Sequence, residues 1–544
     1  MANQPKKPTS PRRASGLIAL IAIALLVAAP IAAVLWRAAA GDGDTVLLGA
    51  GGARYLSGTL LLCLLAGAGA ELIGAATALV VSLTEFPGRR FFSVALVAPF
   101  AIPAYVAAYV YGDLFSPFGF VASFTGPASV PEIRTLPGAA FILMLTTYPY
   151  VYLAMTASLS ARSASLMEAS RMLGAGPAKA ATGILFTASR PAFFGGLALA
   201  LMEIAADYGV ADYFGVSTLS VGIFRTWHGL GDLTGATQLA AGLFLVALVL
   251  VVAEAASRRG RASEDARTAR AAQRLTLSAP HAALAIGLCL LPVLFGFIAP
   301  ASVLLGKLDA DISPAVWRNL TQAGVNTAVI AAAGAAAAMM LALVLAYSAR
   351  TARSGAKRLI LRAATLGYAV PGAVMAIGVL ALSAAVSSTI AQRTGFVVAG
   401  GVVILLYAYV ARFLTAGYNA AEGGLAQISP QMDAASKMLG ASSWRIVTSV
   451  HWPIARLSVL AGAAIVAIDI AKELPATLIL RPFNFETLST QIYRLASDER
   501  LADAAPASLI LIGLGLLPSL ALAIIADRRD KKTRKLKPLA GLAA

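Results

Sequence analysis

The chain has 544 residues and a formal net charge of +17, and 59% of its residues are hydrophobic whereas only 13% are charged. Soluble proteins carry about 25% charged residues, so this composition excludes a soluble enzyme, a disordered chain and a fibrous repeat. It predicts an all-α membrane protein, because a helix of about 20 apolar residues crosses a bilayer.

Apolar runs of this length recur along the whole chain. The first run follows a basic segment, as in a signal peptide, but its roughly 20 apolar residues exceed the usual 7–15, so we expect an uncleaved first helix. Polar residues interrupt the fifth and eleventh runs. The twelve predicted membrane helices lie at about 17–36, 57–83, 91–115, 139–160, 192–214, 237–256, 280–305, 322–348, 359–386, 396–420, 457–480 and 505–526.

Basic residues predict how these helices are oriented. They gather in 1–16, 257–279, 349–362 and 527–544, whereas the loops on the other side carry few. Because cytoplasmic loops of membrane proteins are enriched in Lys and Arg, both termini are expected in the cytoplasm. The basic tail is expected to contact anionic lipid of the bilayer, and no nucleic acid partner is expected.

The chain repeats itself at a nearly constant offset. Residues 168–175 (EASRMLGA) align with residues 434–441 (AASKMLGA), and Pro103 aligns with Pro371. Such self-similarity predicts two homologous halves, and six helices in each half make them parallel repeats. The predicted organisation is a cytoplasmic tail with the first membrane helix (1–55), a first transmembrane core (56–256), a basic cytoplasmic linker (257–279), the seventh helix with an outer loop (280–320), a second core (321–526) and a basic cytoplasmic tail (527–544).

Each copy of the repeat lies in the loop after the fourth predicted helix of its half. It contains good helix formers and ends at Gly174 or Gly440, a helix-stop signal. A short helix outside the membrane packs either against its own chain, as an ordinary connector, or into a partner. Its presence at the same place in both halves favours a partner.

These two loops resemble the EAA motif of bacterial ABC importer permeases, in which EAA is followed by three residues, a glycine and a later Leu-Pro. The loops depart from this motif twice. Ala434, in the second copy, replaces the family's glutamate, and Phe186-Thr187, in the first copy, replaces Leu-Pro. These departures suggest that the first half couples differently from the second. The residues that carry the resemblance are Glu168, Ala169, Ser170 and Gly174 in the first copy, and Asp433, Ala434, Ala435, Gly440 and Pro453 in the second.

The resemblance implies a type I ABC importer permease fold with twelve transmembrane helices in two tandem six-helix halves. It implies a multi-pass protein of the bacterial inner membrane, served by a periplasmic binding protein. Two cytosolic ATPase subunits would seat the two loops, with the acidic residue of the motif contacting basic groups of the ATPase. The chain has no G-x-x-x-x-G-K-[ST] phosphate loop, so ATP is expected to be used by the partner and no cofactor is expected on this chain.

A second stretch points to a branch of that family. Residues 472–488 (KELPATLILRPFNFETL) resemble the fused permeases of ferric-iron importers, which implies ferric iron delivered by a periplasmic ferric-ion-binding protein. The alternatives are the same permease class with thiamine, an aminoalkylphosphonate or a polyamine as substrate, or an ion-coupled secondary transporter. A membrane-embedded enzyme is disfavoured, because the three histidines are scattered.

Two pairs of carboxylates lie inside predicted membrane helices. Glu203 and Asp207 are four residues apart, as are Asp469 and Glu473, so each pair shares one helix face. One interpretation places them on the translocation path, because carboxylate oxygens suit hard cations. The other makes them structural ion pairs, with Lys472 or Arg412 among the candidate partners.

Other polar or helix-breaking residues have simpler interpretations. Pro103 and Pro371 are expected to mark kinks or breaks that could build a gate. Three tyrosines near the outer end of the third helix are interpreted as an interfacial aromatic belt. No metal site is assigned, because the two cysteines and three histidines show no ligand spacing. The three tyrosines are Tyr105, Tyr109 and Tyr111.

Overall fold

The computed structural model describes residues 11–41, 46–47, 49–172, 174, 176, 186–258, 274–308, 313–350, 355–365, 367, 370–394 and 401–517. The predicted tail 527–544 and most of the predicted linker 257–279 lie outside these residues. In the described part, the chain is helical except for loops and one pair of two-residue strands. The expectation of an all-α protein is therefore confirmed.

The contacts divide the chain into two units. The first unit contains residues 1–49, 223–244 and 322–487, and the second contains residues 50–222, 245–321 and 488–544. Each unit therefore combines segments from both predicted halves of the sequence.

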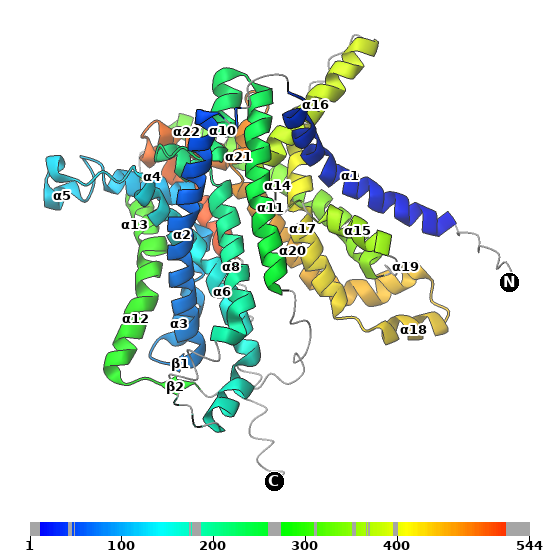
Figure 1. Cartoon of the computed structure of the whole chain (residues 1–544), viewed down its shortest axis with the longest axis horizontal. Coiled ribbons are helices and arrows are strands. Elements are labelled where there is room, and N and C mark those ends of the chain that lie inside the picture. Colours follow the sequence, from blue (N-terminus) through cyan, green and yellow to red (C-terminus); the bar gives the residue numbers. More distant parts are fainter. Residues whose placement is uncertain are drawn as a thin grey trace. The chain divides into compact units, whose positions relative to one another are not determined.

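The second unit is built around long helices (Figure 1). Its strands β1 and β2 pair in parallel, with Thr84 opposite Leu275. Its elements are α2 (Ala50–Leu83), β1 (Thr84–Glu85), α3 (Arg89–Ala95), the 3-10 helix η1 (Ala98–Ala101), α4 (Ala104–Leu114), α5 (Ala122–Thr125), the 3-10 helix η2 (Pro127–Ser129), α6 (Leu136–Met172), α8 (Phe186–Ala206), α9 (Gly209–Tyr213), most of α10 (Leu219–Phe224), β2 (Leu275–Thr276), α12 (Ala279–Val293), the π-helix η5 (Leu294–Ile298), α13 (Ala299–Gly306), α22 (Leu488–Ser497) and a last helix, Leu501–Leu517.

Small residues let the helices of the second unit approach closely. A Cβ on Gly74 of α2 would lie 2.6 Å from the Cβ of Val151, and one on Gly196 of α8 would lie 2.8 Å from the Cα of Val151. Close backbone approach at small residues is the usual way in which membrane helices associate, because lipid supplies no hydrophobic drive. The core around this contact includes the buried Tyr148 of α6, whose hydroxyl donates to the Leu96 carbonyl at 2.7 Å.

The first unit contains the remaining elements (Figure 1). Helices α11 and α14 each run from one unit into the other. The elements are α1 (Pro11–Ala40), the π-helix η4 (Arg225–Gly229), α11 (Leu233–Arg258), α14 (Pro314–Arg350), α15 (Gly355–Ala364), α16 (Gly372–Thr394), α17 (Gly401–Ala426), α18 (Pro430–Met438), α19 (Ser443–Ile446), the π-helix η7 (Val447–His451), α20 (Trp452–Lys472) and α21 (Pro475–Leu480).

The first helix of each predicted half packs in the unit that holds the core of the other half. In the first unit, α1 packs against α15 and α16, and the Tyr407 hydroxyl donates to the Leu26 carbonyl at 2.7 Å. In the second unit, α12 packs against α2 and α3. The first helices of the two halves, and not the whole halves, are thus exchanged between the units.

The described helices match most of the predicted spans. Nine are long and apolar enough to cross a membrane, and Arg89–Ala101 with Ala104–Leu114 makes a further candidate that is bent by 88°. Three predicted runs are each divided between two helices: the fifth between α8 and α9, the ninth between α15 and α16, and the eleventh between α20 and α21. The twelfth matches the shorter helix Leu501–Leu517. The coarse expectation of a multi-span helical protein is confirmed, while the count of twelve stays a prediction.

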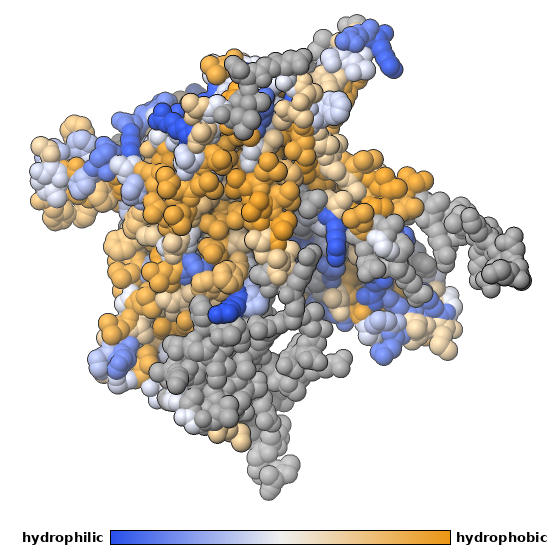
Figure 2. All heavy atoms as spheres, viewed as in Figure 1, coloured by the Kyte–Doolittle hydropathy of each residue, from blue (hydrophilic) through white to orange (hydrophobic). Residues whose placement is uncertain are grey.

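Apolar side chains cover the outer faces of several of these helices. Figure 2 shows hydrophobic surface over the region where α2 lies in Figure 1. In a soluble protein such a surface would cause association, so it indicates contact with lipid tails. Its exposed residues on α2 include Leu60, Leu61, Leu64, Leu65 and Leu72.

Two glycines of α2 provide a test of this packing. A Cβ on Gly58 would lie 2.0 Å from the Ser217 carbonyl oxygen, whereas a Cβ on Gly51 meets nothing within 4 Å. We expect Gly58→Ala to lower the thermal unfolding midpoint of the purified protein, because overpacking costs about 1–3 kcal/mol. Gly51→Ala is the matched control and should leave the midpoint equal or higher, because Ala favours a helix over Gly by about 1 kcal/mol. Equal midpoints for both variants would contradict the close contact.

Candidate functional site

The second copy of the repeated loop forms a short exposed helix. Helix α18 contains Asp433, Ala434 and Ala435, has no buried residue and stops before Gly440. Gly440 has a φ of +74°, in the left-handed region that glycine adopts without strain. Met438 and Leu439, at the end of α18, are 89% and 87% exposed, so this loop presents apolar surface.

Asp433 is held by two basic residues of its own chain. The Asp433 Oδ2 accepts hydrogen bonds from Arg350 Nη2 at 2.8 Å and Nε at 3.0 Å, and its Oδ1 lies 2.7 Å from His451 Nε2. Arg350 also donates to the carbonyls of Leu425 and Ile428, each at 2.9 Å. This clamp fixes α18 to the end of α14 and to the segment before α20.

The clamp also sets the protonation of Asp433. Burial by itself would raise the pKa of this carboxyl, but the hydrogen bonds from His451 and Arg350 outweigh burial and hold the pKa below its usual value. Asp433 therefore remains charged near neutral pH. Its charge meets Arg350 and His451 within the chain, although the motif suggested that it meets basic groups of an ATPase.

Sequence reasoning had no means of finding the other members of the clamp. Arg350 lies in a basic segment and His451 stands alone, so neither has a spacing that points to Asp433. At the offset of the repeat, Asp433 corresponds to Met167 and His451 to Leu185 in the first half. The two acid–base partners therefore have no counterparts there.

The first copy of the loop is arranged differently. The backbone at Glu168, Ala169 and Ser170 continues the long helix α6, which ends at Met172. The expectation of a separate short helix is therefore correct for the second copy and wrong for the first. Gly174 nevertheless has a φ of +76°, so both copies use a left-handed glycine after the helix. Pro453 lies in the first turn of α20, where a proline is well tolerated.

The inner carboxylate of each pair caps the break that follows a long helix. Asp207 Oδ1, directly after α8, accepts the backbone N–H groups of Val210 at 2.9 Å and Ala211 at 3.2 Å. Glu473 Oε1, directly after α20, accepts the N–H of Ala476 at 3.1 Å. A carboxylate in this position satisfies donors at the start of the next short helix, α9 or α21.

Glu473 is also paired with a cation. It is only 7% exposed, and its Oε2 accepts a hydrogen bond from Arg412 Nη1 of α17. A Cβ on Gly372 of α16 would lie 2.4 Å from both Arg412 Nη1 and Glu473 Oε1, so a larger residue there would force one of these two side chains to move. The structural interpretation of Asp207 and Glu473 therefore has direct support. Glu203 and Asp469 lie one turn earlier on α8 and α20.

Both matched prolines stand at helix boundaries. Pro103 separates η1 from α4 at the 88° bend, and Pro371 directly precedes α16. In each case the backbone leaves the helical path before the proline ring, as expected for a residue that disfavours helix before it.

The interpretation of three tyrosines as a lipid-facing belt is wrong. Tyr105, Tyr109 and Tyr111 are 5%, 2% and 4% exposed, so they cannot contact lipid head groups. Their rings fill the core of the second unit. The Tyr111 hydroxyl donates to the Phe295 carbonyl at 2.6 Å, and Tyr109 packs edge-on against Tyr213 at 4.7 Å between ring centroids.

Comparison with known proteins points to transport. Residues 70–258 match the family described as binding-protein-dependent transport system inner membrane component. The Fe(3+)-transport system permease protein FbpB 2 of Haemophilus influenzae is 26% identical over 86% of this chain and 88% of its own length. The probable sulfate transport system permease protein cysT of Nephroselmis olivacea is 28% identical over 36% of this chain and 70% of its own length. The putative 2-aminoethylphosphonate transport system permease protein PhnV of Salmonella typhimurium is 30% identical over 20% and 41%.

The clamp on α18 can be tested by hydrogen exchange. Arg350→Ala should speed amide exchange in residues 430–438 by about tenfold or more, because hydrogen bonds to charged groups contribute about 1.5–3 kcal/mol. The measurement is exchange mass spectrometry on the purified full chain. Arg445→Ala, at an exposed arginine of the neighbouring α19, is the control and should leave this exchange unchanged. Similar rates in both variants and the wild type would show that α18 does not depend on Arg350.

The buried ion pair can be tested by removing one partner and then both. Arg412→Met should lower stability by about 3–5 kcal/mol, because it removes one partner of a buried ion pair while the Glu473 charge stays buried. Arg412→Met with Glu473→Met should recover most of this loss, less about 1 kcal/mol for the lost cap at Ala476. The thermal unfolding midpoint of the purified protein measures both effects. A single variant as stable as the wild type would contradict the pairing.

Proposed function

We propose that this chain, whose residues 70–258 form a domain of the binding-protein-dependent transport inner membrane component family, is the permease subunit of an ATP-driven importer for ferric iron. The observation that supports ferric iron as the substrate is the similarity to the Fe(3+)-transport permease, which extends over 86% of this chain. The sulfate permease cysT and the phosphonate permease PhnV match 36% and 20% of it. As a permease component, the chain is a transport subunit and not an enzyme.

The proposal places the chain in the bacterial inner membrane as twelve helices in two parallel six-helix halves of the type I importer fold. Both termini face the cytoplasm, in accord with the distribution of Lys and Arg. A periplasmic binding protein delivers ferric ion from outside. Two cytosolic ATPase subunits bind the ATP, since this sequence has no phosphate loop.

The loops after α6 and α17 are the proposed docking sites for the ATPases. Support comes from the exposed Met438 and Leu439 and from the left-handed glycines Gly174 and Gly440 in both copies. In the second loop the Asp433 clamp connects α18 to α14 and α20, so a displacement of α18 is passed directly to helices of the first unit. The docking contact is therefore made by the apolar end and backbone of α18, and Asp433 holds that helix in place.

Four carboxylates remain the proposed lining of the translocation path, with divided roles. Asp207 and Glu473 accept backbone hydrogen bonds where α8 and α20 end, so they shape the backbone. Glu203 on α8 and Asp469 on α20, each one turn earlier, are the residues proposed to face the ion. Carboxylate oxygens suit a hard cation such as ferric iron. Pro103 and Pro371, at the neighbouring helix breaks, are the proposed gate positions.

A second candidate substrate is an oxyanion such as sulfate or a phosphonate. The similarity of part of this chain to permeases named for those substrates favours it. Sulfate and a phosphonate carry negative charge, so carboxylates on the path would repel them, whereas they would attract a cation. The partial coverage of these relatives and the acidic residues proposed to face the ion, Glu203 and Asp469, make ferric iron the better-supported substrate.

Uptake of labelled substrate tests this function. Iron-starved cells that lack the gene should lose uptake of labelled ferric iron and regain it with the wild-type gene. Gly440→Glu should abolish the rescue while the protein still inserts, because it puts a charged side chain on the docking surface. Gly440→Ala controls for backbone strain at the positive φ, and Gly423→Glu, at an exposed glycine near the end of α17, controls for an added charge.

Labelled sulfate, aminoethylphosphonate and thiamine are measured in parallel. Loss of sulfate or phosphonate uptake with normal iron uptake would retain the permease and reject ferric iron. Full rescue by an inserted Gly440→Glu protein would reject the docking role of the second loop.

A further inference from the structure

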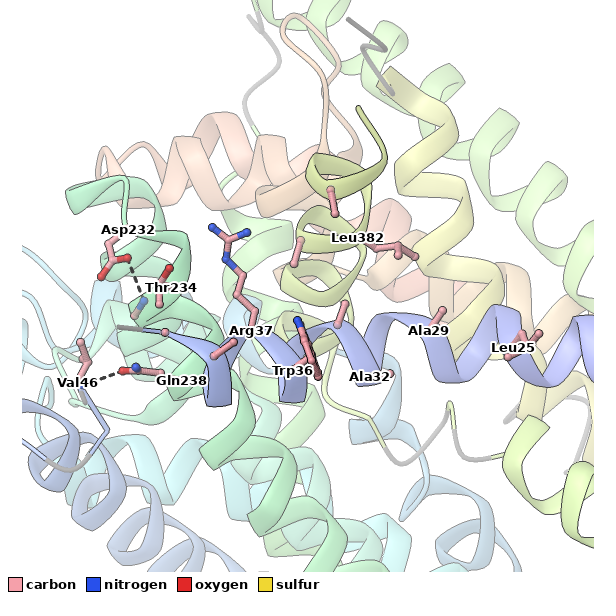
Figure 3. Close-up of a pocket in the computed structure, with 16 residues that line it drawn as sticks. Leu25, Ala29, Ala32, Trp36, Arg37, Val46, Asp232, Thr234, Gln238 and Leu382 are labelled. Carbon is pink, nitrogen blue, oxygen red and sulfur yellow. Dashed lines mark hydrogen bonds between the residues drawn. The ribbon is translucent and has the colours of Figure 1, made fainter. Parts of the chain in front are cut away.

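An open hollow lies within the first unit, beside the outer part of α1. Its volume is about 1200 Å³, which is larger than a typical drug-sized site. Figure 3 shows it between α1, the start of α11 and α16. The small and aliphatic residues of its lining are Leu25, Ala29, Ala32, Ala33, Ala381, Leu382 and Ala385.

The length of the hollow matches one leaflet of a bilayer. Its lining on α1 runs from Leu25 to Arg37 and on to Gly41. At 1.5 Å per residue, the distance from Leu25 to Arg37 is about 18 Å. Half of a hydrocarbon core that is about 30 Å thick is about 15 Å. An acyl chain that lies along the alanines therefore brings its head group to Arg37.

The end of the hollow at Arg37 carries two opposite charges. Figure 3 shows the Arg37 side chain extending from α1 into the space between Asp232, at the start of α11, and Leu382 of α16. The Arg37 Nε is buried and has no hydrogen-bond partner in the described part of the chain. A ligand cannot reach a nitrogen that is closed to solvent, so the group that needs an acceptor in the hollow is the terminal guanidinium of Arg37, whose side chain lines it.

Asp232 does not supply that acceptor. No ion pair joins it to Arg37 among the described residues, and its Oδ1 instead accepts the Gly235 N–H at 3.0 Å, at the start of α11. Nearby, Gln238 Oε1 accepts the Val46 N–H at 2.7 Å. These hydrogen bonds hold the Asp232 and Gln238 side chains in place. Arg37 and Asp232 both line the hollow and are not paired with each other.

We propose that this hollow binds a phospholipid with a primary-amine head group, of the phosphatidylethanolamine type. The phosphate accepts hydrogen bonds from Arg37, the ammonium group donates to Asp232, and an acyl chain lies along the alanines of α1 and α16. Such a head group carries both charges that the site complements, whereas an anionic lipid leaves Asp232 without a cation. Trp36, which is 76% exposed beside Arg37, is a side chain typical of the membrane interface.

The proposal goes beyond the transport function and does not depend on the substrate. Only the choice of leaflet depends on the proposed orientation of the chain, which places the bound lipid in the outer leaflet. A bound lipid would connect α1 to α11, two helices that belong to the first unit through separate segments of the chain.

Lipid binding to the full chain, purified in detergent, tests the site. Native mass spectrometry measures adducts with phosphatidylethanolamine, phosphatidylglycerol and phosphatidylcholine of identical acyl chains. Phosphatidylethanolamine should bind best. Arg37→Gln should weaken binding of all three by about tenfold or more, because it removes a charge-assisted contact to phosphate.

Two further variants separate the head-group and acyl-chain contacts. Asp232→Asn keeps the helix cap, because Asn caps as well as Asp, and should remove the preference for phosphatidylethanolamine. Ala29→Phe should fill the hollow and reduce binding of all three lipids. Ala22→Phe, on an exposed face of α1 outside the hollow, is its control and should bind like the wild type.

Two outcomes would overturn the proposal. Unchanged phosphatidylethanolamine binding in both Arg37→Gln and Ala29→Phe would show that the hollow is not the lipid site. A preference for phosphatidylglycerol that Asp232→Asn leaves unchanged would show that the site selects negative charge alone. Neither outcome depends on uptake, so the transport function is tested separately.

Discussion

In the hydrocarbon of a bilayer, a backbone N–H or C=O group without a partner costs several kcal/mol, so a helix that stops inside the membrane must have its backbone groups satisfied by other parts of the protein. At the ends of α8 and α20 this constraint is met by one carboxylate each, Asp207 and Glu473. The negative charge of Glu473 is compensated by Arg412, and Gly372 leaves room for that pair. These caps satisfy backbone donors at the start of the short helices α9 and α21, and so stabilise the breaks that follow α8 and α20.

The two copies of the repeated loop have similar sequences but different structures. After α17 the chain turns and starts the separate helix α18, which Asp433 ties to Arg350 and His451. In the first half, the equivalent backbone simply extends α6. A helix that extends a span moves with that span, whereas a separate helix needs a clamp to transmit displacement. The presence of Asp433 in the second copy alone agrees with that requirement.

Composition and hydropathy were sufficient to predict the helical class, most spans and the positions of both loop glycines, because these depend on local chemistry. The repeat also placed Asp207 and Glu473 at equivalent positions, and Arg412 was among the candidate partners of such an intramembrane carboxylate. Periodicity could not find the Asp433 clamp, since Arg350 and His451 come from distant segments. It also misassigned Tyr105, Tyr109 and Tyr111, because an aromatic run has the same pattern in a core as at an interface. The division of the fifth span required knowledge of the Asp207 cap.

The exchange of first helices between the two halves has a consequence for biosynthesis. Helix α1 is synthesised early, whereas its partners α15 and α16 are synthesised more than 300 residues later. The surface of α1 that packs against them therefore stays without these partners during most of translation. Because all three helices belong to one chain, α1 packs against α15 and α16 in an intramolecular step, at the high effective concentration that a covalent connection provides. Joining the halves in one polypeptide thereby gives equal amounts of both and favours pairing of α1 with the second half of its own molecule.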